Sequence, residues 1–80
     1  MPYNLQEAFL NSARKRRVKT TIYLVNGVRL QGRIKSFDIF TILIEEGRQQ
    51  TLVYKHAITT VIPMERLEIE FEEEGLPGAG

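Results

Sequence analysis

TTIYLVNGVRLQGRI, residues 20–34, is the stretch of sequence that decides the fold. β-Branched and aromatic side chains dominate its first half. In its second half apolar and polar residues alternate, which is typical of a half-buried strand. The dipeptide Asn26-Gly27 separates the two halves and is a strong signal for a type I′ hairpin turn. The sequence therefore predicts two antiparallel strands joined by a two-residue turn.

A two-residue turn fixes which residues face one another across this hairpin. It pairs Val25 with Val28 and Tyr23 with Leu30, and directly paired residues share a face of the sheet. We therefore expect these four side chains to form one aromatic and aliphatic patch, although the pattern alone is equally compatible with plain sheet core. Gly32 inside the second strand predicts a sharp bend or a close backbone approach.

Three further short strands follow, at residues 40–44, 51–54 and 58–62, with a turn at residues 45–48 and Pro63 ending the last strand. The last strand is apolar and uncharged, so it is poorly protected as a free edge. Pairing with the edge of a neighbouring copy would satisfy it, and a rotation that closes makes a ring.

A short helix is expected before the strands, at about residues 5–16. Asn4 can cap its N-terminus, and Glu7 three residues later completes a capping-box pattern. The four cations at residues 14–17 fall at its C-terminal end, where they complement the helix dipole.

The length of 80 residues gives room for one domain. The absence of Cys, with His56 as the one histidine, excludes disulfides and a Cys/His zinc site. No apolar run approaches the roughly 20 residues that a membrane helix needs, and the first ten residues do not have the order of a secretory signal. These features favour a soluble protein of the cytoplasm.

The charge is divided unevenly along the chain. Residues 1–64 carry ten basic and four acidic side chains, a formal charge of +6, and residues 65–80 carry one basic and six acidic side chains, a charge of −5. We therefore expect a domain at residues 1–64 and an acidic, disordered tail at 65–80. A basic body with an acidic tail is common in proteins that bind polyanions, although solubility alone could explain it.

Catalysis is not indicated by the sequence. Asp38 is the one aspartate and His56 the one histidine, and no phosphate-binding loop pattern is present. We expect no enzyme activity, no cofactor, no bound metal and no small-molecule substrate.

Six short segments, spread over roughly residues 4–63, match a known pattern. They are Leu5-Gln6, Phe9-Leu10-Asn11, Ile22-Tyr23-Leu24-Val25-Asn26-Gly27, Leu30-Gln31-Gly32, Ser36-Phe37-Asp38 with Phe40, and Tyr54-Lys55-His56-Ala57-Ile58. Together they resemble Hfq, the bacterial branch of the Sm/LSm family, and the run at 54–57 is specific to that branch.

The resemblance implies a mainly β, Sm-like fold, with an N-terminal α-helix on a strongly bent five-stranded antiparallel sheet. It implies a closed homohexameric ring, made by pairing the fourth strand of one subunit with the fifth strand of the next. It also implies an RNA chaperone that binds single-stranded U-rich and A-rich RNA and promotes pairing of small regulatory RNAs with mRNAs in post-transcriptional regulation and the stress response.

The first surface implied by the resemblance is the proximal face of the ring, which takes uridine. Its residues are Gln6, Ile39, Phe40, Tyr54, Lys55 and His56. Phe40 would stack on a base, and Gln6 and Lys55 would read its edge. Ile39 stands where many relatives carry Gln, so it removes one hydrogen-bonding group. Without the resemblance, the two aromatics would be read as core and His56 as structural.

The second surface implied by the resemblance is the distal face, which takes adenine-rich RNA. Its residues are Tyr23, Asn26, Gly27, Val28, Leu30, Gln31, Thr51 and Thr60. Tyr23 would stack on a purine, and Leu30 would pack against a base. Thr51 stands where many relatives carry a Gln that reads adenine, and Gln50 is the alternative candidate for that role.

The third surface implied by the resemblance is the rim, which contacts the bodies of RNAs and speeds annealing. Its residues are Asn11, Arg14, Lys15, Arg16, Arg17 and Phe37. Dense cations lower the repulsion between two RNA strands, and Arg16 adds one where many relatives carry an acid. A solvated helix end is the plainer interpretation of the same charges, and the acidic tail is expected to compete with RNA here.

Two other functions fit the pattern. An OB-type or cold-shock binder is also five-stranded and basic, but it displays adjacent stacking aromatics on central strands. A purely structural ring would form the same oligomer without salt-dependent RNA binding. Native mass separates the first from a ring, and RNA titration separates the second.

Overall fold

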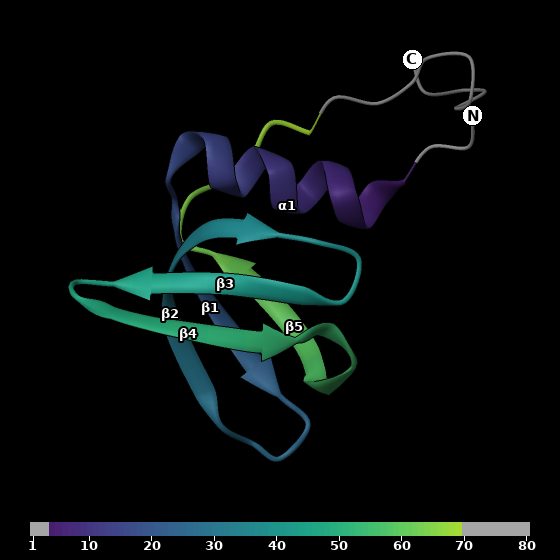
Figure 1. The fold of residues 1–80 in the computed structure, drawn as a ribbon. Helices are drawn as coiled ribbons and strands as arrows, with labels where there is room; N and C mark the ends of the chain where they lie inside the picture. The colour runs from purple at the N-terminus through teal and green to yellow at the C-terminus, as the bar shows by residue number, and fades with distance from the viewer. Residues whose placement is uncertain (1–3, 70–80) are drawn as a thin grey trace.

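A computed structural model describes residues 4–69, which form one helix and one antiparallel sheet (Figure 1). The elements are α1 (Leu5–Arg16), β1 (Lys19–Leu24), β2 (Arg29–Phe37), β3 (Thr41–Glu46), β4 (Gln49–Tyr54), the 3-10 turn η1 (Lys55–Ala57) and β5 (Ile58–Pro63). The strand order is β4-β3-β2-β1-β5, and α1 lies across one end of the strongly curved sheet. The predicted N-terminal helix and five-stranded antiparallel sheet are confirmed. Residues 1–3 and 70–80, most of the predicted acidic tail, lie outside the described residues.

Backbone groups at both ends of helix α1 are hydrogen-bonded. The Glu7 N–H donates to Asn4 Oδ1 at 3.0 Å, which caps the N-terminus. Arg17 takes a left-handed conformation with φ of 55° and donates its N–H to the carbonyls of Ala13 and Arg14. This left-handed cap turns the chain from the helix directly into β1.

The hydrophobic core lies between α1 and the concave side of the sheet. Its buried members are Leu10, Ala13, Ile22, Ile34, Ile42, Ile44 and Val53, with Leu24, Leu30, Phe37, Ile58, Val61 and Leu67 packed around them. All five strands and the helix contribute, so burial of apolar surface holds every element in place. Leu67 extends this packing beyond β5, since residues 66–68 lie alongside α1.

The β1–β2 hairpin differs from the predicted type I′ turn. That turn needs positive φ at both central residues, but only Gly27, with φ of 88°, has it. The Asn26 side chain instead accepts the Val28 N–H at 3.0 Å. The Gly27 N–H donates to the Leu24 carbonyl and the Leu24 N–H to the Val28 carbonyl, both at 2.9 Å. The loop therefore has three residues, 25–27, and ends in a left-handed glycine.

The extra loop residue shifts the strand register by one. Tyr23 pairs with Arg29, and Ile22 pairs with Leu30, so the predicted pairing of Tyr23 with Leu30 is wrong. A shift of one residue moves a side chain to the other face of the sheet. Leu30 therefore packs against the core, and the predicted four-residue patch does not form.

Gly32 is the point where β2 comes closest to β3. An added Cβ would lie 2.6 Å from Ile44 Cγ2 and 2.7 Å from the Glu45 carbonyl oxygen. The close backbone approach predicted at this glycine is confirmed. The sheet can bend tightly here because no side chain stands between the two strands.

The two edges of the sheet are β4 and β5. Each carries large apolar side chains in solvent, Leu52 and Tyr54 on β4 and Ile62 on β5. Within residues 4–69, neither strand has a second pairing partner. Long exposed apolar edges are hazards that proteins normally cover.

Candidate nucleic-acid interface

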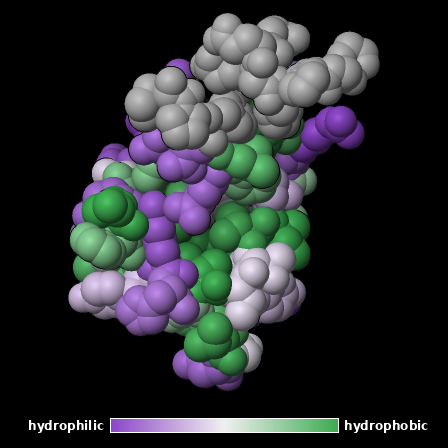
Figure 2. All heavy atoms as spheres, turned by 90° about the vertical axis from the view of Figure 1, so that its right-hand side faces the viewer, coloured by the Kyte–Doolittle hydropathy of each residue, from purple (hydrophilic) through white to green (hydrophobic). Residues whose placement is uncertain are grey.

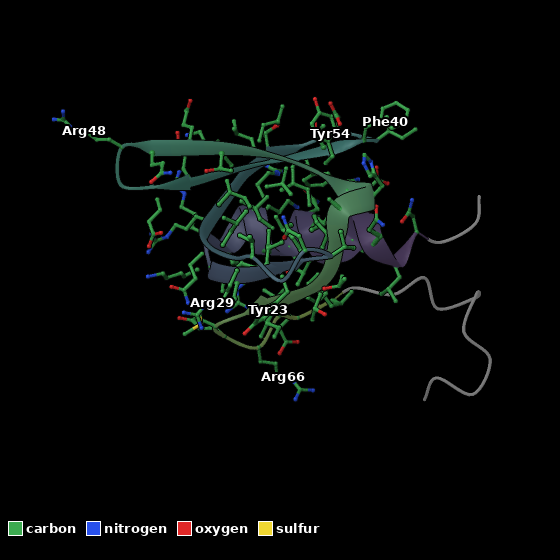
Figure 3. The ribbon with its side chains drawn as sticks, turned by 90° about the horizontal axis from the view of Figure 1, so that it is seen from below. Tyr23, Arg29, Phe40, Arg48, Tyr54 and Arg66 are labelled. Carbon is green, nitrogen blue, oxygen red and sulfur yellow. The ribbon has the colours of Figure 1, made fainter. Side chains whose placement is uncertain are left out.

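Phe40 and Lys55 are held together by the backbone. The Lys55 N–H donates to the Phe40 carbonyl at 2.8 Å, which joins the start of η1 to the loop between β2 and β3. The Phe40 side chain is 69% exposed, so its ring is available to a flat ligand. Figure 3 shows Phe40 and Tyr54 projecting together from one side of the sheet.

Asp38 shapes the loop that presents Phe40. Its Oδ1 accepts the Phe40 N–H at 2.8 Å, the Thr41 N–H at 2.7 Å and the Thr41 hydroxyl at 2.8 Å. These bonds, the Phe40 N–H first, lower the pKa of Asp38, with a smaller contribution from the charge of Lys55. The carboxylate therefore stays ionised and the loop keeps its shape at neutral pH.

The Lys55 side chain is fixed by contacts with α1 and β2. Its Nζ donates to Gln6 Oε1 at 3.1 Å and lies 5.5 Å from the centre of the Phe37 ring. Gln6, Phe37, Ile39 and Lys55 line one pocket of about 250 Å³, together with Asn4, Glu7 and Asp38. We call Gln6, Phe37, Ile39, Phe40 and Lys55 the Lys55 site. Phe37, predicted at the rim, lines this pocket and not the basic groove described below.

Tyr54 and His56 lie beside the Lys55 site. Their rings are 5.9 Å apart between centroids and inclined at 36°, and both side chains are exposed. Lys55, the first residue of the 3-10 turn, separates the two in the sequence, and its side chain is bound to Gln6 of α1. The structure thus brings the predicted proximal residues into one neighbourhood.

The opposite side of the sheet carries Tyr23. Thr60, Tyr23 and Arg29 form one row across β5, β1 and β2. The next row on the same face contains Thr21 and Gln31, joined by a 3.2 Å hydrogen bond from Gln31 Nε2 to Thr21 Oγ1. We call these five residues the Tyr23 face. Figure 3 shows Tyr23 and Arg29 on the side away from Phe40 and Tyr54.

Thr51 lies near the Tyr23 face, whereas Gln50 does not. Thr51 and Gln31 line one shallow pocket of about 170 Å³ with Gln49 and four further residues. Gln50 pairs with Glu45 and donates to its carboxylate at 2.8 Å, on the other face of β4. Gln49 is therefore better placed than Gln50 to supply an amide beside Gln31.

The tip of the β1–β2 hairpin is exposed and tied to η1. Asn26, Gly27 and Val28 are open to solvent. The Val25 N–H donates to the Ala57 carbonyl at 2.8 Å. One backbone hydrogen bond thus joins the loop beside Tyr23 to the turn that begins with Lys55.

Cations from two elements line a third site, a groove of about 530 Å³. Its residues are Arg14, Lys15, Arg17, Arg33, Ile34, Lys35 and Glu45, and we call it the basic groove. Arg16, also predicted at the rim, instead donates to the Arg66 carbonyl at 3.5 Å. Asn11 accepts a hydrogen bond from Arg14 at 2.6 Å. The predicted rim is thus divided between the groove and its neighbours.

Three cations were missed by the sequence prediction. Arg29 lies beside Tyr23, and Arg33 and Lys35 complete the basic groove. The alternation of charged and apolar residues at 33–35 was the available signal, because Arg33 and Lys35 flank the buried Ile34. Their nearness to the end of α1 could not be read from a strand pattern.

The part of the chain that the structure describes has neither a membrane-spanning helix nor a cluster of metal-binding side chains. No helix there is long and apolar enough to cross a membrane. The same residues contain no group of three His, Asp or Glu side chains that could hold a metal ion.

Comparison with known proteins identifies the family of this chain. Residues 5–68 match the family model described as Hfq protein. This chain belongs to the Hfq family. The match covers α1, all five strands and the residues that return along α1, so every surface described above lies within it.

Curated Hfq relatives cover most of this chain. RNA-binding protein Hfq of Fervidobacterium nodosum is 50% identical over 72 residues, 90% of this chain and 82% of the relative. RNA-binding protein Hfq of Ruminiclostridium cellulolyticum is 49% identical over 72 residues, 90% of each chain.

Solved Hfq structures share the fold. A crystal structure described as the pleiotropic translational regulator Hfq is 29% identical and has a TM-score of 0.71, covering 74% of this chain and 98% of that chain. An Hfq protein from Anabaena is 28% identical with a TM-score of 0.68, covering 72% and 93%.

Proposed function

We propose that this protein is a cytoplasmic RNA chaperone that binds single-stranded RNA as a closed homohexameric ring. U-rich RNA binds at the Lys55 site, and A-rich RNA binds at the Tyr23 face. The basic groove contacts the bodies of small regulatory RNAs and mRNAs and promotes their pairing. The curated relatives are named as RNA-binding proteins, which supports the RNA part of the proposal.

The observation that carries the proposal is the arrangement of Phe40 beside Lys55 and Gln6. Phe40 is 69% exposed, although a phenylalanine ring is normally buried in a folded domain. Its backbone carbonyl accepts the Lys55 N–H at 2.8 Å, and the Lys55 ammonium group donates to the Gln6 amide oxygen at 3.1 Å. Stacking on such a ring is worth about 1–3 kcal/mol per base, and the polar groups can read a base edge.

The composition of the Tyr23 face supports the proposal that a second RNA strand binds there, on the side of the sheet opposite the Lys55 site. Tyr23 is half-buried and offers an aromatic surface, with Arg29 and Thr60 on either side of it. Gln31 supplies an amide whose orientation is fixed by Thr21. An aromatic surface beside an arginine suits a purine, since stacking and cation–π attraction act together.

The exposed apolar side chains on the two edge strands support the proposal of a ring. Leu52 on β4 and Ile62 on β5 are both about half exposed, and pairing β4 of one copy with β5 of the next would cover them. Apolar side chains also line a groove of about 410 Å³ between α1 and β5, and Figure 2 shows hydrophobic groups gathered on this side of the molecule. A heterologous contact that closes on itself yields a ring.

Native mass spectrometry with oligo-U and oligo-A tests assembly and both faces together. We expect a six-subunit ring that binds both RNAs. Phe40→Ala should weaken oligo-U binding by roughly 5- to 150-fold, the equivalent of one lost stack, and leave oligo-A binding intact. Tyr23→Ala should have the opposite selectivity.

Each variant is the control for the other, because both remove one aromatic side chain. A monomer that binds RNA would favour an OB-type binder and overturn the ring. A ring that binds neither RNA at any salt concentration would favour a structural scaffold and overturn the RNA function.

The acidic segment at residues 65–80 is proposed to compete with RNA for the basic groove. Its first part already runs beside α1, where Ser12 Oγ lies 3.4 Å from the Glu68 carbonyl oxygen. Deleting residues 70–80 keeps this contact and the packing of Leu67 while removing four of the acidic side chains. The deletion should raise RNA affinity at low salt, and unchanged affinity and release rate would contradict competition.

A further inference from the structure

Asn26 stands in a setting in which an asparagine side chain can react with its own backbone. The backbone nitrogen of the residue after an asparagine can attack the side-chain amide carbon, and a side chain on that residue hinders the attack. Asn26 is followed by Gly27, which has no side chain, whereas the other two asparagines precede Leu5 and Ser12. The Asn26 amide is therefore the least hindered of the three.

The other two asparagines are tied to helix α1. Asn4 Oδ1 accepts the Glu7 N–H at 3.0 Å, and Asn11 Oδ1 accepts a hydrogen bond from Arg14 at 2.6 Å. Asn11 also lies inside α1, where backbone N–H groups donate to carbonyls one turn back. These two residues are internal controls, because they have the same side chain in a less reactive setting.

The reaction at Asn26 consumes water and needs no other reagent. A base in solution removes the proton of the Gly27 N–H, the nitrogen bonds to the side-chain carbon of Asn26, and the amide nitrogen takes up a proton and leaves as ammonia. This gives a cyclic imide. Water then adds to either carbonyl of the imide and breaks its bond to the Gly27 nitrogen. The chain is left with an aspartyl or an isoaspartyl residue at position 26.

The folded loop occupies both groups that this reaction needs. The Gly27 N–H donates to the Leu24 carbonyl at 2.9 Å, so the proton that must leave is held. Asn26 Oδ1 accepts the Val28 N–H at 3.0 Å, which holds the side-chain amide at the residue after Gly27. Both bonds have to break before the nitrogen can reach the amide carbon.

Hydrogen bonds, and not apolar packing, hold this loop closed. Val25 is 66% exposed and Val28 is 45% exposed, and nothing lies within 4 Å of a Cβ added to Gly27. A further bond runs from the Val25 N–H to the Ala57 carbonyl at 2.8 Å. A segment with exposed backbone bonds and few apolar contacts opens at a lower free-energy cost than the core.

We propose that Asn26 is a site of spontaneous deamidation that requires the loop between β1 and β2 to open, and that the carboxylate formed there weakens RNA binding at the Tyr23 face. The modified fraction would then rise with the age of the protein. The effect on RNA rests on the proposed function, because the new charge lies in the loop that follows Tyr23 and repels phosphates. The chemical step does not depend on RNA.

Peptide mapping by mass spectrometry tests the site and the need for opening. The full chain in its native assembly is kept at mildly alkaline pH, and deamidation of Asn4, Asn11 and Asn26 is followed over time. A synthetic peptide of residues 20–32 has the same covalent neighbours without the folded loop. We expect conversion at Asn26 alone, more slowly than in the peptide. Equal conversion at all three asparagines would overturn the site, and equal rates in protein and peptide would overturn the need for opening.

Hydrogen exchange of the Gly27 amide gives an independent measure of opening. Exchange also requires the bond to the Leu24 carbonyl to break, so folding should slow deamidation at least as much as it slows exchange. Deamidation that is slowed less than exchange would mean attack within the closed loop. A protein whose Gly27 amide exchanges fully while Asn26 stays intact, under conditions that convert the peptide, would contradict the site.

Asn26→Asp measures the effect of the new charge, and Asn26→Ser is its matched control. Both variants lose the amide, but serine adds no charge and its hydroxyl can still accept the Val28 N–H. At low salt Asn26→Asp should bind oligo-A roughly 1.5- to 5-fold more weakly than Asn26→Ser, the size of one exposed charge contact. The difference should shrink as the salt concentration rises.

Equal oligo-A affinity of the two variants would sink the effect on RNA, while the mass-spectrometric result would still decide the chemical step. Wild-type protein that binds no oligo-A would sink the proposed function of the Tyr23 face together with that effect.

Discussion

The Lys55 site and the Tyr23 face lie on opposite sides of one small sheet, and they are built in different ways. The Lys55 site joins Gln6 of α1, Phe40 of a loop and Lys55 of η1, which are far apart in the sequence. The Tyr23 face is a set of neighbours across three adjacent strands. The first therefore depends on how separate elements dock, and the second depends on strand register.

Because of this difference, a displacement of α1 and a shift in strand register would each damage one site and leave the other intact. Moving the helix would separate Gln6 from Lys55 and leave the rows of the Tyr23 face intact. A register shift of one residue would replace Tyr23 by a core residue and leave the Lys55 pocket in place. Variants can therefore be chosen to damage both sites, the sheet alone, or one site alone.

Gly32→Ala should have the largest effect, because β2 contributes to both sites. The added Cβ would meet a side-chain methyl at 2.6 Å and the Glu45 carbonyl oxygen at 2.7 Å. Overpacking of this kind costs about 1–3 kcal/mol, or roughly 4–8 °C in Tm per kcal/mol. Thermal unfolding should show the loss, and oligo-U and oligo-A affinities should fall together.

Gly27→Ala is the control for that variant, since nothing lies within 4 Å of its added Cβ. Its cost comes from the positive φ alone, about 1 kcal/mol. A Tm for Gly32→Ala equal to wild type would contradict the close approach of β2 and β3.

Leu30→Ala separates the observed register from the predicted one. With Leu30 packed on the core, its half-buried side chain should contribute about 1–2 kcal/mol of folding stability. Chemical denaturation should show this loss, while oligo-A affinity of the folded protein stays near wild type. A selective loss of oligo-A binding with normal stability would instead place Leu30 on the same face as Tyr23.

Asp38→Ala should damage the Lys55 site and spare the Tyr23 face. It removes the acceptor of three hydrogen bonds that shape the Phe40 loop. Oligo-U affinity should fall toward that of Phe40→Ala, and oligo-A affinity should not change. Asp38→Asn keeps an oxygen acceptor and should retain most of the binding, so an equal loss in both variants would argue against the loop bonds.

Protonation of Asp38 should have the smallest effect of these changes, because this carboxyl group is exposed. The folded protein lowers the pKa of Asp38 below its ordinary value of 3.8, chiefly through the Phe40 N–H. A lowered pKa means that the stabilisation is present above pH 3.8 and is lost as pH falls through the folded value. Carboxyl NMR titration should show this, and a normal pKa for Asp38 would contradict the bonds drawn to it.

Patterns of local sequence predicted much of the fold. Asn4 and the cations after Ala13 marked the two ends of α1, and the β-branched runs marked the strands. Gly32 was correctly assigned to a close approach. These features depend on neighbours in the sequence, so propensity and periodicity suffice to find them.

The hairpin register was not predictable from Asn26-Gly27. The same dipeptide fits a type I′ turn and a three-residue loop that ends in a left-handed glycine. The bond from the Val28 N–H to the Asn26 side chain favours the second, and it is a three-dimensional contact that no periodicity reveals. Phe37 and the β2 cations were missed or misplaced for a similar reason, because their positions depend on where α1 docks.

The bond from the Val25 N–H to the Ala57 carbonyl joins the loop that follows Tyr23 to the 3-10 turn that begins with Lys55. This one bond therefore joins a segment next to the proposed adenine site to a segment next to the proposed uridine site. Coupling free energy between two ligands is reciprocal. If adenine binding changes the affinity for uridine through this bond, uridine binding must therefore change the affinity for adenine by the same factor.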